Sequence, residues 1–429
     1  MKDEKSGRMI RSQLRLAAEL WRGVRQDPIP ADRFLSRYFF HNRKKIGSRD
    51  RRFISETIYG AFRNKSFLEA WATELDGNSA MNGAAGDEFF CALSAAKEGL
   101  LEAEGLREFK IPEKAYGFIR SHDLPPNHNP ASPEESLALL YSFPLWLVRR
   151  WVERYGFTGT ENLLAFFHKR PRLVIRTNTL KIDREELLEW FKRRGLCAER
   201  TLRSSCGVIL NERKNILDTE AFRDGWFEIQ DEGSQLVCQK MEVRPGEIIW
   251  DVCAGGGGKS LSLAAIMGNK GRIVATDLRT YKLDEIKKRA KRAGAFNIFP
   301  ADLGRMNELT SAQKGFDKIL VDAPCSGTGT FSRNPDAKWR IDESWLTNLP
   351  AEQFSIIEKA LPYLKKNGRL YYVTCSLEPV ENEGVVQKVL SVHPEMRKIP
   401  CGEQGGDFFK LWPVESGTDG FFLATLEKI

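Results

Sequence analysis

No apolar run in the sequence is long enough to cross a membrane. The first residues, MKDEKSGRMIRSQ, lack the apolar stretch of a signal peptide, so we expect a cytoplasmic protein. Histidine is scarce, and its five copies show no metal-ligand spacing, so no metal site is expected. Eight cysteines in 429 residues do not suggest a disulfide framework, and they are expected to be free thiols, buried or reactive.

Positive charge is concentrated in two segments of the chain. Residues 1–65 hold 17 basic and 7 acidic side chains, and residues 149–214 hold 16 and 8, whereas residues 66–123 hold 5 and 11. Either basic segment alone could be a solvated helix surface. Together they have the electrostatic footprint of nucleic-acid binding, so we expect RNA or DNA as a partner.

Three domains are expected, in a chain that we expect to be a monomer. Residues 1–135 show helical periodicity, and their Pro-, Asn- and Ser-rich end, 121–135, is typical of a linker. Residues 136–235 combine a strand at 173–181 with a helix at 183–195, as in a small α+β domain. Residues 236–429 form the third domain. The first helix should bury one face, made by Ile10, Leu14, Ala17, Ala18 and Trp21.

Strands and helices alternate through the third domain. This alternation predicts an α/β fold with a mostly parallel, seven-stranded sheet covered by helices. The helices include 280–293 and 350–366, and the last two strands form a possible antiparallel edge. The apolar runs that predict the strands are 246–252, 272–277, 297–302, 317–323 and 369–375, followed by DFFKLW and GFFLATLEK.

The stretch DVCAGGGGKS at 251–260 is similar at first sight to a phosphate-binding loop. A Walker loop would need glycine in place of Cys253, and the dinucleotide pattern G-x-G-x-x-G would need glycine in place of Ser260. What remains is a glycine-rich turn between strand and helix, where backbone can approach a ligand closely. The cofactor-binding residues predicted here are Cys253, Ala254, Gly255, Gly256, Gly257, Gly258 and Lys259.

An acid stands at the end of four successive strands: Asp251, Asp277, Asp302 and Asp322. Asp277 takes the place of a ribose-binding carboxylate, and Asp302 could meet the edge of an adenine. This pattern suits a nucleoside cofactor without a pyrophosphate, such as S-adenosylmethionine, and hence a class I, Rossmann-like methyltransferase domain. Asp322 and Lys282 complete the predicted cofactor-binding set.

Two cysteines suggest the chemistry. Cys325 in VDAPCSGTGT and Cys375 in YYVTCSLEP follow the fourth and fifth strands, so both thiols should lie at the cofactor edge of the sheet. A thiolate that adds to C6 of cytosine makes C5 nucleophilic toward a methyl donor. Asp322 could stabilise the ring at N3, and Lys259 could position groups or lower a thiol pKa. The base would leave its stack to reach the pocket, and the spacing leaves open which cysteine attacks.

These motifs resemble those of the Sun/Nop family of RNA cytosine-5 methyltransferases over roughly residues 140–429. The family loop D-x-C-A-A-P-G-G-K-T is similar to residues 251–260, with Gly255-Gly256 in place of Ala-Pro. D-A-P-C-S-G-x-G matches residues 322–329, and T-C-S matches residues 374–376. The resemblance implies that Cys375 is the nucleophile and that Cys325 assists product release.

Further segments extend the resemblance to RNA contacts. QDEGSQLV at 230–237 resembles the family segment that precedes the loop. RTNTLK at 176–181 and NPDAKWR at 334–340 resemble family elements that imply RNA-binding residues: Arg176, Asn178, Lys181, Arg333, Lys338 and Arg340. GSRDRRFISETIYGAFR at 47–63 is similar to the helical, NusB-like extension of the bacterial ribosomal members, which implies small-subunit ribosomal RNA as substrate.

Two other functions remain open at this point. An amino-group methyltransferase of nucleic acids would need no covalent thiol. A ribosome-assembly factor that binds RNA could carry the same residues as a vestigial site, since Gly255-Gly256 departs from the family loop.

Overall fold

The computed structural model describes residues 2–76, 83–109, 111–211, 216–305 and 315–429. The chain forms two compact units. The helical unit comprises the chain up to Arg170 together with Phe331–Ile341, and the sheet unit comprises Pro171–Thr330 and Asp342–Ile429. The expected α+β and methyltransferase domains thus share one compact unit, and the boundaries near 135 and 235 stay a prediction.

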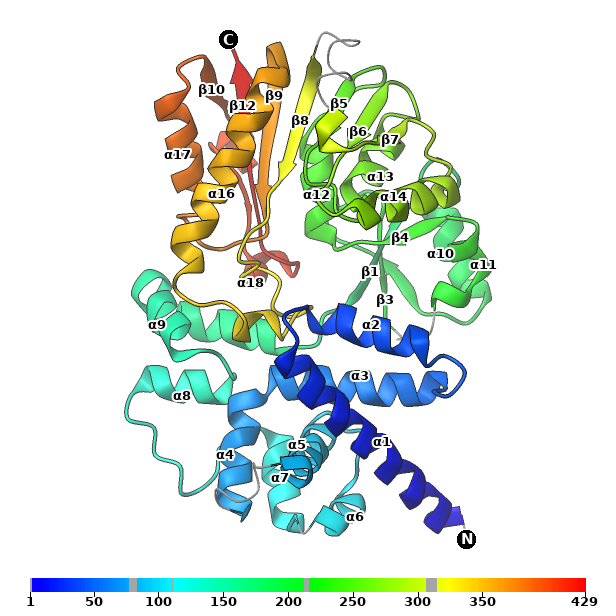
Figure 1. The fold of residues 1–429 in the computed structure, drawn as a ribbon, viewed down its shortest axis with the longest axis vertical. Coiled ribbons are helices and arrows are strands. Elements are labelled where there is room, and N and C mark those ends of the chain that lie inside the picture. The colour runs from blue at the N-terminus through cyan, green and yellow to red at the C-terminus, as the bar shows by residue number, and fades with distance from the viewer. Residues whose placement is uncertain (1, 77–82, 110, 212–215, 306–314) are drawn as a thin grey trace. The chain divides into compact units, whose positions relative to one another are not determined.

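The helical unit is built almost entirely of α-helices, as predicted for the N-terminal region (Figure 1). Leu14, Ala17, Ala18 and Trp21 are buried in its core and Ile10 packs at the margin, which confirms the predicted face. No described helix has the length and apolarity needed to span a bilayer. The helices are α1 (Lys2–Gln26), α2 (Ala31–His41), α3 (Ser48–Arg63), α4 (Lys65–Asp76), α5 (Gly83–Lys97), α6 (Ala103–Leu106), α7 (Glu113–Ser121), α8 (Pro133–Leu140) and α9 (Leu145–His168).

The segment Phe331–Ile341 belongs to the core of the helical unit, although it is distant in sequence from the helices. The Phe331 ring packs against Phe143, Trp151 and Phe167. The indole N–H of Trp339 donates to the Phe62 carbonyl at 2.8 Å. The segment therefore ties the chain after Cys325 into a core made by the first 170 residues.

A small antiparallel sheet opens the sheet unit, with strand order β2-β3-β1-β4. Helix α10 (Arg184–Arg193) has Asp183 as its N-cap, and Gly195 follows it at φ +64°, so this helix and its ends agree with the sequence prediction. The remaining elements are β1 (Leu173–Thr177), β2 (Ala198–Arg200), β3 (Gly207–Leu210), α11 (Glu220–Arg223) and β4 (Phe227–Ile229).

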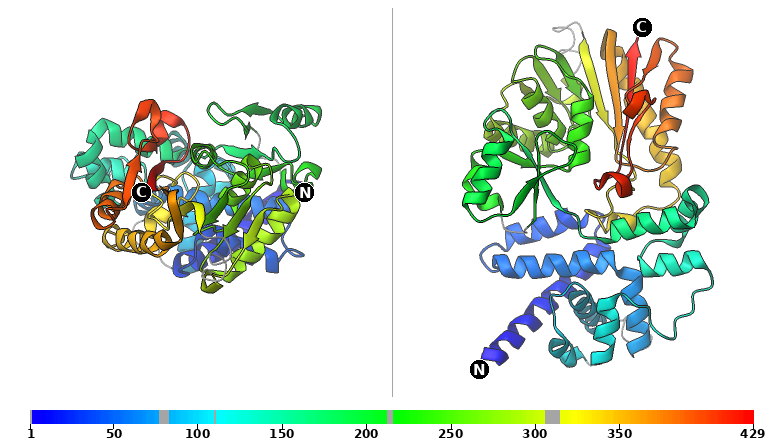
Figure 2. Two further views of the ribbon diagram at one scale, coloured as in Figure 1. Left: turned by 90° about the horizontal axis from the view of Figure 1, so that it is seen from above. Right: turned by 180° about the vertical axis from the view of Figure 1, so that it is seen from behind.

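The large sheet has the strand order β10-β12-β9-β8-β5-β6-β7, and β11 pairs with β12. Strands β5 to β9 are parallel, whereas β12 runs antiparallel to β9 and β10 (Figures 1 and 2). The strands are β5 (Ile248–Asp251), β6 (Arg272–Ala275), β7 (Ile298–Pro300), β8 (Phe316–Asp322), β9 (Leu364–Thr374), β10 (Met396–Ile399), β11 (Phe409–Leu411) and β12 (Phe421–Lys428). The mostly parallel α/β fold is thus confirmed.

Helices cover both faces of this sheet. One core packs α12 (Glu232–Lys240), α13 (Gly258–Ile266) and α14 (Thr280–Ala293) on one face, and the other packs α16 (Trp345–Ala360) and α17 (Glu383–Val392) on the opposite face. The chain leaves β5 toward β6 and β7, then returns to place β8 and β9 on the other side of β5. Ligands of such sheets bind where the strand order reverses, at the carboxyl ends of β5 and β8.

Two details differ from the sequence prediction. The described part of the sheet has eight strands rather than seven, because the short edge strand β10 has two basic residues between its apolar ends and therefore no apolar run. The predicted helix 350–366 ends as α16 at Ala360, and Leu364 begins β9. Pro362 accounts for this end, since proline lacks the N–H that a continuing helix requires.

Candidate active site at the carboxyl edge of the sheet

The glycine-rich turn joins β5 to α13. Gly255 and Gly257 have φ of +54° and +80°, which residues with a Cβ adopt at a cost. A Cβ on Gly255 or Gly258 would meet no atom within 4 Å, so backbone on this side of the turn is open to a ligand. The first N–H groups of α13 have no acceptor within the helix and can receive a carboxylate.

The acids predicted at the strand ends differ in their partners. Asp251 is fully buried, accepts from Ser260 Oγ at 2.5 Å through Oδ2, and has no hydrogen-bond partner for Oδ1. Burial raises the pKa of Asp251 to about 7. Asp302 accepts from the Gly304 N–H at 2.8 Å. An unpartnered buried oxygen beside an open turn fits a ligand that carries donors or positive charge.

Asp277 follows β6 and contacts the glycine turn directly. Its Oδ2 accepts from the Gly255 N–H at 3.0 Å, and its Oδ1 accepts from Arg279 N at 2.9 Å. Burial opposes ionisation, but hydrogen bonds from Arg279 outweigh burial and lower the pKa of Asp277. The carboxylate is therefore charged and held beside the turn, as a ribose-binding group would be.

Lys259 links the glycine turn to the turn after β8. Its Nζ donates to Asp322 Oδ2 at 2.6 Å. Burial is the largest single influence and disfavours the ammonium, but the charge and hydrogen bond of Asp322, together with the nearby Cys238 and Cys375, outweigh burial and raise the pKa of Lys259. The same ammonium also interacts electrostatically with Cys375. The pair brings a fixed positive charge and a carboxylate to the place where the sequence predicts a reacting base.

The two predicted catalytic thiols meet. Cys325 Sγ lies 3.4 Å from Cys375 Sγ, and both side chains are partly exposed, whereas Cys91 and Cys238 are buried. The hydrogen bond with Cys375 and burial both raise the pKa of Cys325, so its thiolate form is disfavoured, and either sulfur can donate the hydrogen bond between them. The arrangement gives one thiol donor and one sulfur acceptor, which is what a nucleophile with an assisting thiol requires.

Sequence reasoning missed Arg289, which braces the glycine turn from α14. Its guanidinium donates to the Gly256 carbonyl at 2.6 Å and to Glu228 at 3.0 Å. A Cβ on Gly256 would lie 2.7 Å from Glu285 Oε1 and 2.9 Å from Arg289 Nη1. The helical spacing of Lys282, Glu285 and Arg289 gave no signal that α14 faces this turn. Lys282, predicted to bind cofactor, donates to Glu285 at 2.6 Å.

Three of the predicted RNA-binding residues are buried. Arg176 donates to Gln230 at 2.7 Å, and Asn178 donates to the Gly225 and Ala293 carbonyls. Lys338 lies in the helical unit, where its Nζ donates to the Arg63 carbonyl at 3.2 Å, and burial lowers its pKa. These side chains hold backbone in place and expose no group to a phosphate, so we leave them out of the proposed RNA interface.

The other three candidates keep exposed surface. Lys181 is exposed and donates to the Asp224 carbonyl at 2.8 Å, Arg340 is half-buried and pairs with Asp336 at 3.0 Å, and Arg333 is half-buried.

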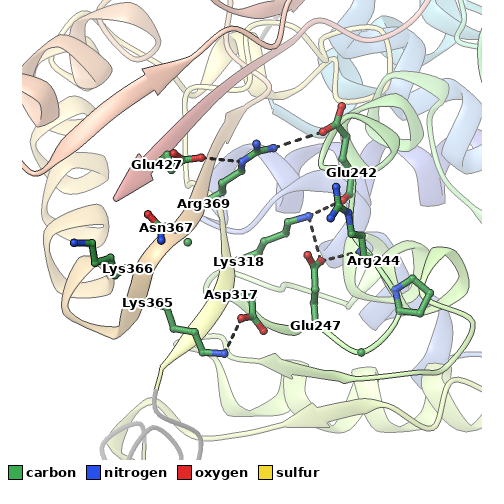
Figure 3. Close-up of a pocket in the computed structure, with 13 residues that line it drawn as sticks. Glu242, Arg244, Glu247, Asp317, Lys318, Lys365, Lys366, Asn367, Arg369 and Glu427 are labelled. Carbon is green, nitrogen blue, oxygen red and sulfur yellow. Dashed lines mark hydrogen bonds and ion pairs between the residues drawn. The ribbon is translucent and has the colours of Figure 1, made fainter. Parts of the chain in front are cut away.

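A separate cavity of about 610 Å³ lies at the opposite edge of the sheet, where β5 and β8 begin (Figure 3). Its charged side chains pair with one another: Lys318 with Glu247 at 3.1 Å, Lys365 with Asp317 at 2.7 Å, and Arg369 with Glu427 at 3.4 Å. The described residues that line it include no cysteine and none of the predicted cofactor-binding residues. The chemistry is therefore assigned to the carboxyl edge.

The parallel sheet, the glycine turn at its switch point and the strand-end acids define a class I methyltransferase. Residues 238–427 match the family described as 16S rRNA methyltransferase RsmB/F, and residues 143–217 match the ferredoxin-like domain of the RsmF/B-like methyltransferases. The chain belongs to this family, which confirms the resemblance seen in the sequence.

Matches to known proteins cover most of the chain. The probable ribosomal RNA small subunit methyltransferase B of Bacillus subtilis is 34% identical over 309 residues, which are 69% of this chain and 68% of that protein. Its counterpart in Synechocystis is 30% identical over 411 residues, 88% and 91% of the two chains. The crystal structure of PH0851 matches with a TM-score of 0.78 and 25% identity over 97% and 99% of the chains. The crystal structure of a methyltransferase homologue from Pyrococcus horikoshii matches with a TM-score of 0.60 and 29% identity, and the match covers 68% of this chain and 98% of that chain.

The cofactor of this enzyme is S-adenosylmethionine, and the chain is an RNA methyltransferase that uses it. The site residues fit this molecule. Three carboxylates, Asp251, Asp277 and Asp322, suit its positively charged sulfonium and ammonium groups. The open backbone of the glycine turn and the N-terminus of α13 suit its carboxylate, and Asp277 suits its ribose.

Proposed function

We propose that the enzyme methylates C5 of a cytosine in small-subunit ribosomal RNA through a covalent bond between Cys375 and C6. The observation that supports this chemistry is the 3.4 Å approach of the Cys325 and Cys375 sulfurs at the cofactor edge of the sheet. An amino-group methyltransferase has no use for two facing thiols. The ribosomal substrate is supported by the family and by the relatives named above.

Cys375 performs the attack. Its thiolate forms a bond to C6, and the electron pair of the C5–C6 double bond moves toward C5 and the N3 side of the ring. Asp322 takes a proton from its partner Lys259, and the protonated carboxyl then donates a hydrogen bond to N3 and stabilises this charge. S-adenosylmethionine supplies an electrophilic methyl group. C5 then carries both a methyl group and a proton. Transfer of this proton to water in the site and departure of the Cys375 thiolate from C6 together restore the C5–C6 double bond.

Cys325 assists release of the methylated base. When the C6–Sγ bond breaks, its electron pair returns to Cys375 as a thiolate. The Cys325 thiol faces this sulfur and donates a hydrogen bond to it, which stabilises the departing charge. The family resemblance assigns the attack to Cys375, and the raised pKa of Cys325 agrees with a thiol that stays protonated to assist release.

We also propose that the helical unit contributes RNA contacts. Arg43, Lys44, Lys45 and Arg49 are exposed where α2 ends and α3 begins. Clustered cations of this kind bind phosphates without sequence preference and position an RNA. Lys181, Arg333 and Arg340 remain candidates for further contacts.

Bisulfite sequencing of ribosomal RNA from cells with and without the gene tests this function. We expect one cytosine of the small-subunit RNA to lose its protection when the gene is deleted, and to regain it with the wild-type gene but not with Cys375→Ala. An unchanged map, or full rescue by Cys375→Ala, would reject cytosine-5 methylation. Mass spectrometry of nucleosides from the same RNA would then reveal an amino-group product.

A further inference from the structure

The two turns that carry the cysteines are cross-linked by hydrogen bonds. The Gly329 N–H donates to the Cys375 carbonyl at 2.9 Å, and the Leu377 N–H donates to Thr328 Oγ1 at 2.8 Å. Ser326 and Ser376, which directly follow the cysteines, place their Oγ atoms 3.0 Å apart. The serine that follows each catalytic cysteine therefore points to a common centre.

That centre is the carboxylate of Glu381, which is fully buried. Oε2 accepts from the Ser326 N–H at 2.9 Å and from Gln353 Nε2 at 2.9 Å. Oε1 accepts from Ser376 Oγ at 2.7 Å and also from Ser326 Oγ. One carboxylate thus binds both cysteine-bearing turns, and Gln353 also donates to the Pro324 carbonyl beside Cys325.

A carboxylate satisfies this arrangement with every donor in place. Four donors converge on two oxygens, and an ionised carboxyl accepts at both and donates at neither. Glutamine has the same shape, but its N–H₂ at the Oε1 position would force both serine hydroxyls to turn and accept instead of donate. Burying a carboxylate is costly unless hydrogen bonds replace its hydration, so a glutamate in this position indicates that its acceptors are needed.

We propose that Glu381 is a positioning residue that fixes the separation of the Cys325 and Cys375 thiols. The inference rests on the proposed use of both thiols in catalysis. Glu381 touches neither sulfur, and it acts through Ser326 and Ser376. Its charge also adds to the raised pKa of Cys325, after the hydrogen bond with Cys375 and burial. Glu381 thereby favours the state in which Cys325 keeps its proton and Cys375 is free to attack.

Thiol–disulfide exchange with glutathione measures the separation without any RNA. The Cys375 thiolate attacks oxidised glutathione and releases one glutathione thiolate. The Cys325 thiolate then attacks the Cys375 sulfur of the mixed disulfide and releases the second, so two protein thiols are oxidised as one glutathione disulfide is reduced. The equilibrium constant has units of concentration and reports how well the protein holds the two sulfurs together.

We expect Glu381→Gln to lower this constant by roughly tenfold or more, because the two turns lose their shared acceptor. Glu383→Gln is the matched control: Glu383 lies two residues away and pairs with Lys410. It should leave the constant within about twofold of wild type. Peptide mass spectrometry would identify the Cys325–Cys375 bond, and calorimetry with S-adenosylmethionine would show that each variant keeps its cofactor site.

In methylation assays, Glu381→Gln should lower kcat while the KM for RNA stays near the wild-type value. An exchange constant equal to that of wild type in folded Glu381→Gln would overturn the proposal. If Glu381→Gln does not fold, Ser376→Ala removes one of the four donors, and an unchanged constant there would equally overturn it. If the wild-type protein does not methylate cytosine, while Glu381→Gln still lowers the exchange constant, the proposed function is rejected and the positioning role of Glu381 stands.

Discussion

Lys259 Nζ and Asp322 Oδ2 lie 2.6 Å apart and join the glycine turn after β5 to the turn after β8. One residue belongs to the predicted cofactor loop and the other to the Pro-Cys motif. The ion pair therefore links the turn proposed to bind the methyl donor to the turn proposed to hold the base.

Replacing Asp322 with Asn should shift the pH dependence of methylation. Without the Asp322 charge, burial dominates and the pKa of Lys259 falls from its raised value. Lys259 then loses its proton at lower pH, so the alkaline limb of the rate profile should move to lower pH, and kcat should fall by roughly 10²-fold. Steady-state rates measured between pH 6 and 10 check this prediction. If the alkaline limb does not move, the protonation state of Lys259 does not control the rate at high pH.

The two cysteine variants should fail in different ways. Cys375→Ala removes the nucleophile and should abolish methyl transfer and adduct formation. Cys325→Ala should still form the C6 adduct but release it slowly, so a protein–RNA band should persist in denaturing gels. Cys91→Ala, at a buried cysteine in the core of the helical unit, is the control and should retain turnover. A persistent band with Cys375→Ala would contradict the assignment of the nucleophile.

Arg289→Ala should weaken S-adenosylmethionine binding. The guanidinium fixes the Gly256 carbonyl from α14, and losing a charged hydrogen bond of this kind costs about 1.5 kcal/mol, or roughly a tenfold rise in Kd. Arg292 also bonds Glu228 but is not among the residues that contact Gly256, so Arg292→Ala is the matched control. Calorimetry on both variants decides the matter: equal Kd values would show that the brace has no effect on the cofactor.

The helical unit should lose stability as the pH falls below about 6.5. The rings of His122 and His168 lie 4.5 Å apart, and both His122 ring nitrogens are buried without partners. Burial lowers the pKa of His122 to about 4 and also lowers that of His168. Histidines of the unfolded chain bind protons near pH 6.5. Between about pH 6.5 and 4 the unfolded chain therefore binds more protons than the folded chain, and the free energy of unfolding decreases as the pH falls.

Thermal unfolding measured across this pH range checks the histidine effect. His122→Phe should flatten the pH dependence because one titrating group is removed from the stack. His128→Ala, at an exposed position, should leave the pH dependence as in wild type. Equal slopes for wild type and His122→Phe would contradict the proposed role of the buried pair.

Local motifs made much of the site predictable. The glycine turn, the strand-end acids and both Cys-Ser pairs follow strands that are continuous apolar runs, and parallel strands bring their ends to one edge. That rule predicted that Cys325 and Cys375 share this edge. It did not predict their 3.4 Å approach, because the approach depends on Glu381, whose partner Ser326 lies 55 residues earlier in the chain.

Other features depend on contacts that sequence patterns do not record. Arg289 donates a hydrogen bond to the Gly256 carbonyl, 33 residues earlier in the chain, and its position in the helical pattern is that of any exposed basic residue. Lys338 lies in a motif rich in polar residues, yet tertiary packing buries it beneath carbonyl acceptors and aromatic rings. The charge pattern of a loop motif therefore predicted an RNA contact at Lys338, whereas the fold uses its buried amine to hold the chain.

The segment Phe331–Ile341 has a consequence for dissecting the protein. The catalytic chain leaves its own unit after Thr330 and resumes at Asp342. Deleting the first 170 residues would remove the residues that surround Phe331, Lys338 and Trp339. Their apolar rings and the Lys338 side chain would then be exposed to water. A soluble catalytic fragment should therefore need this eleven-residue excursion replaced by a short polar linker, and a simple truncation should aggregate.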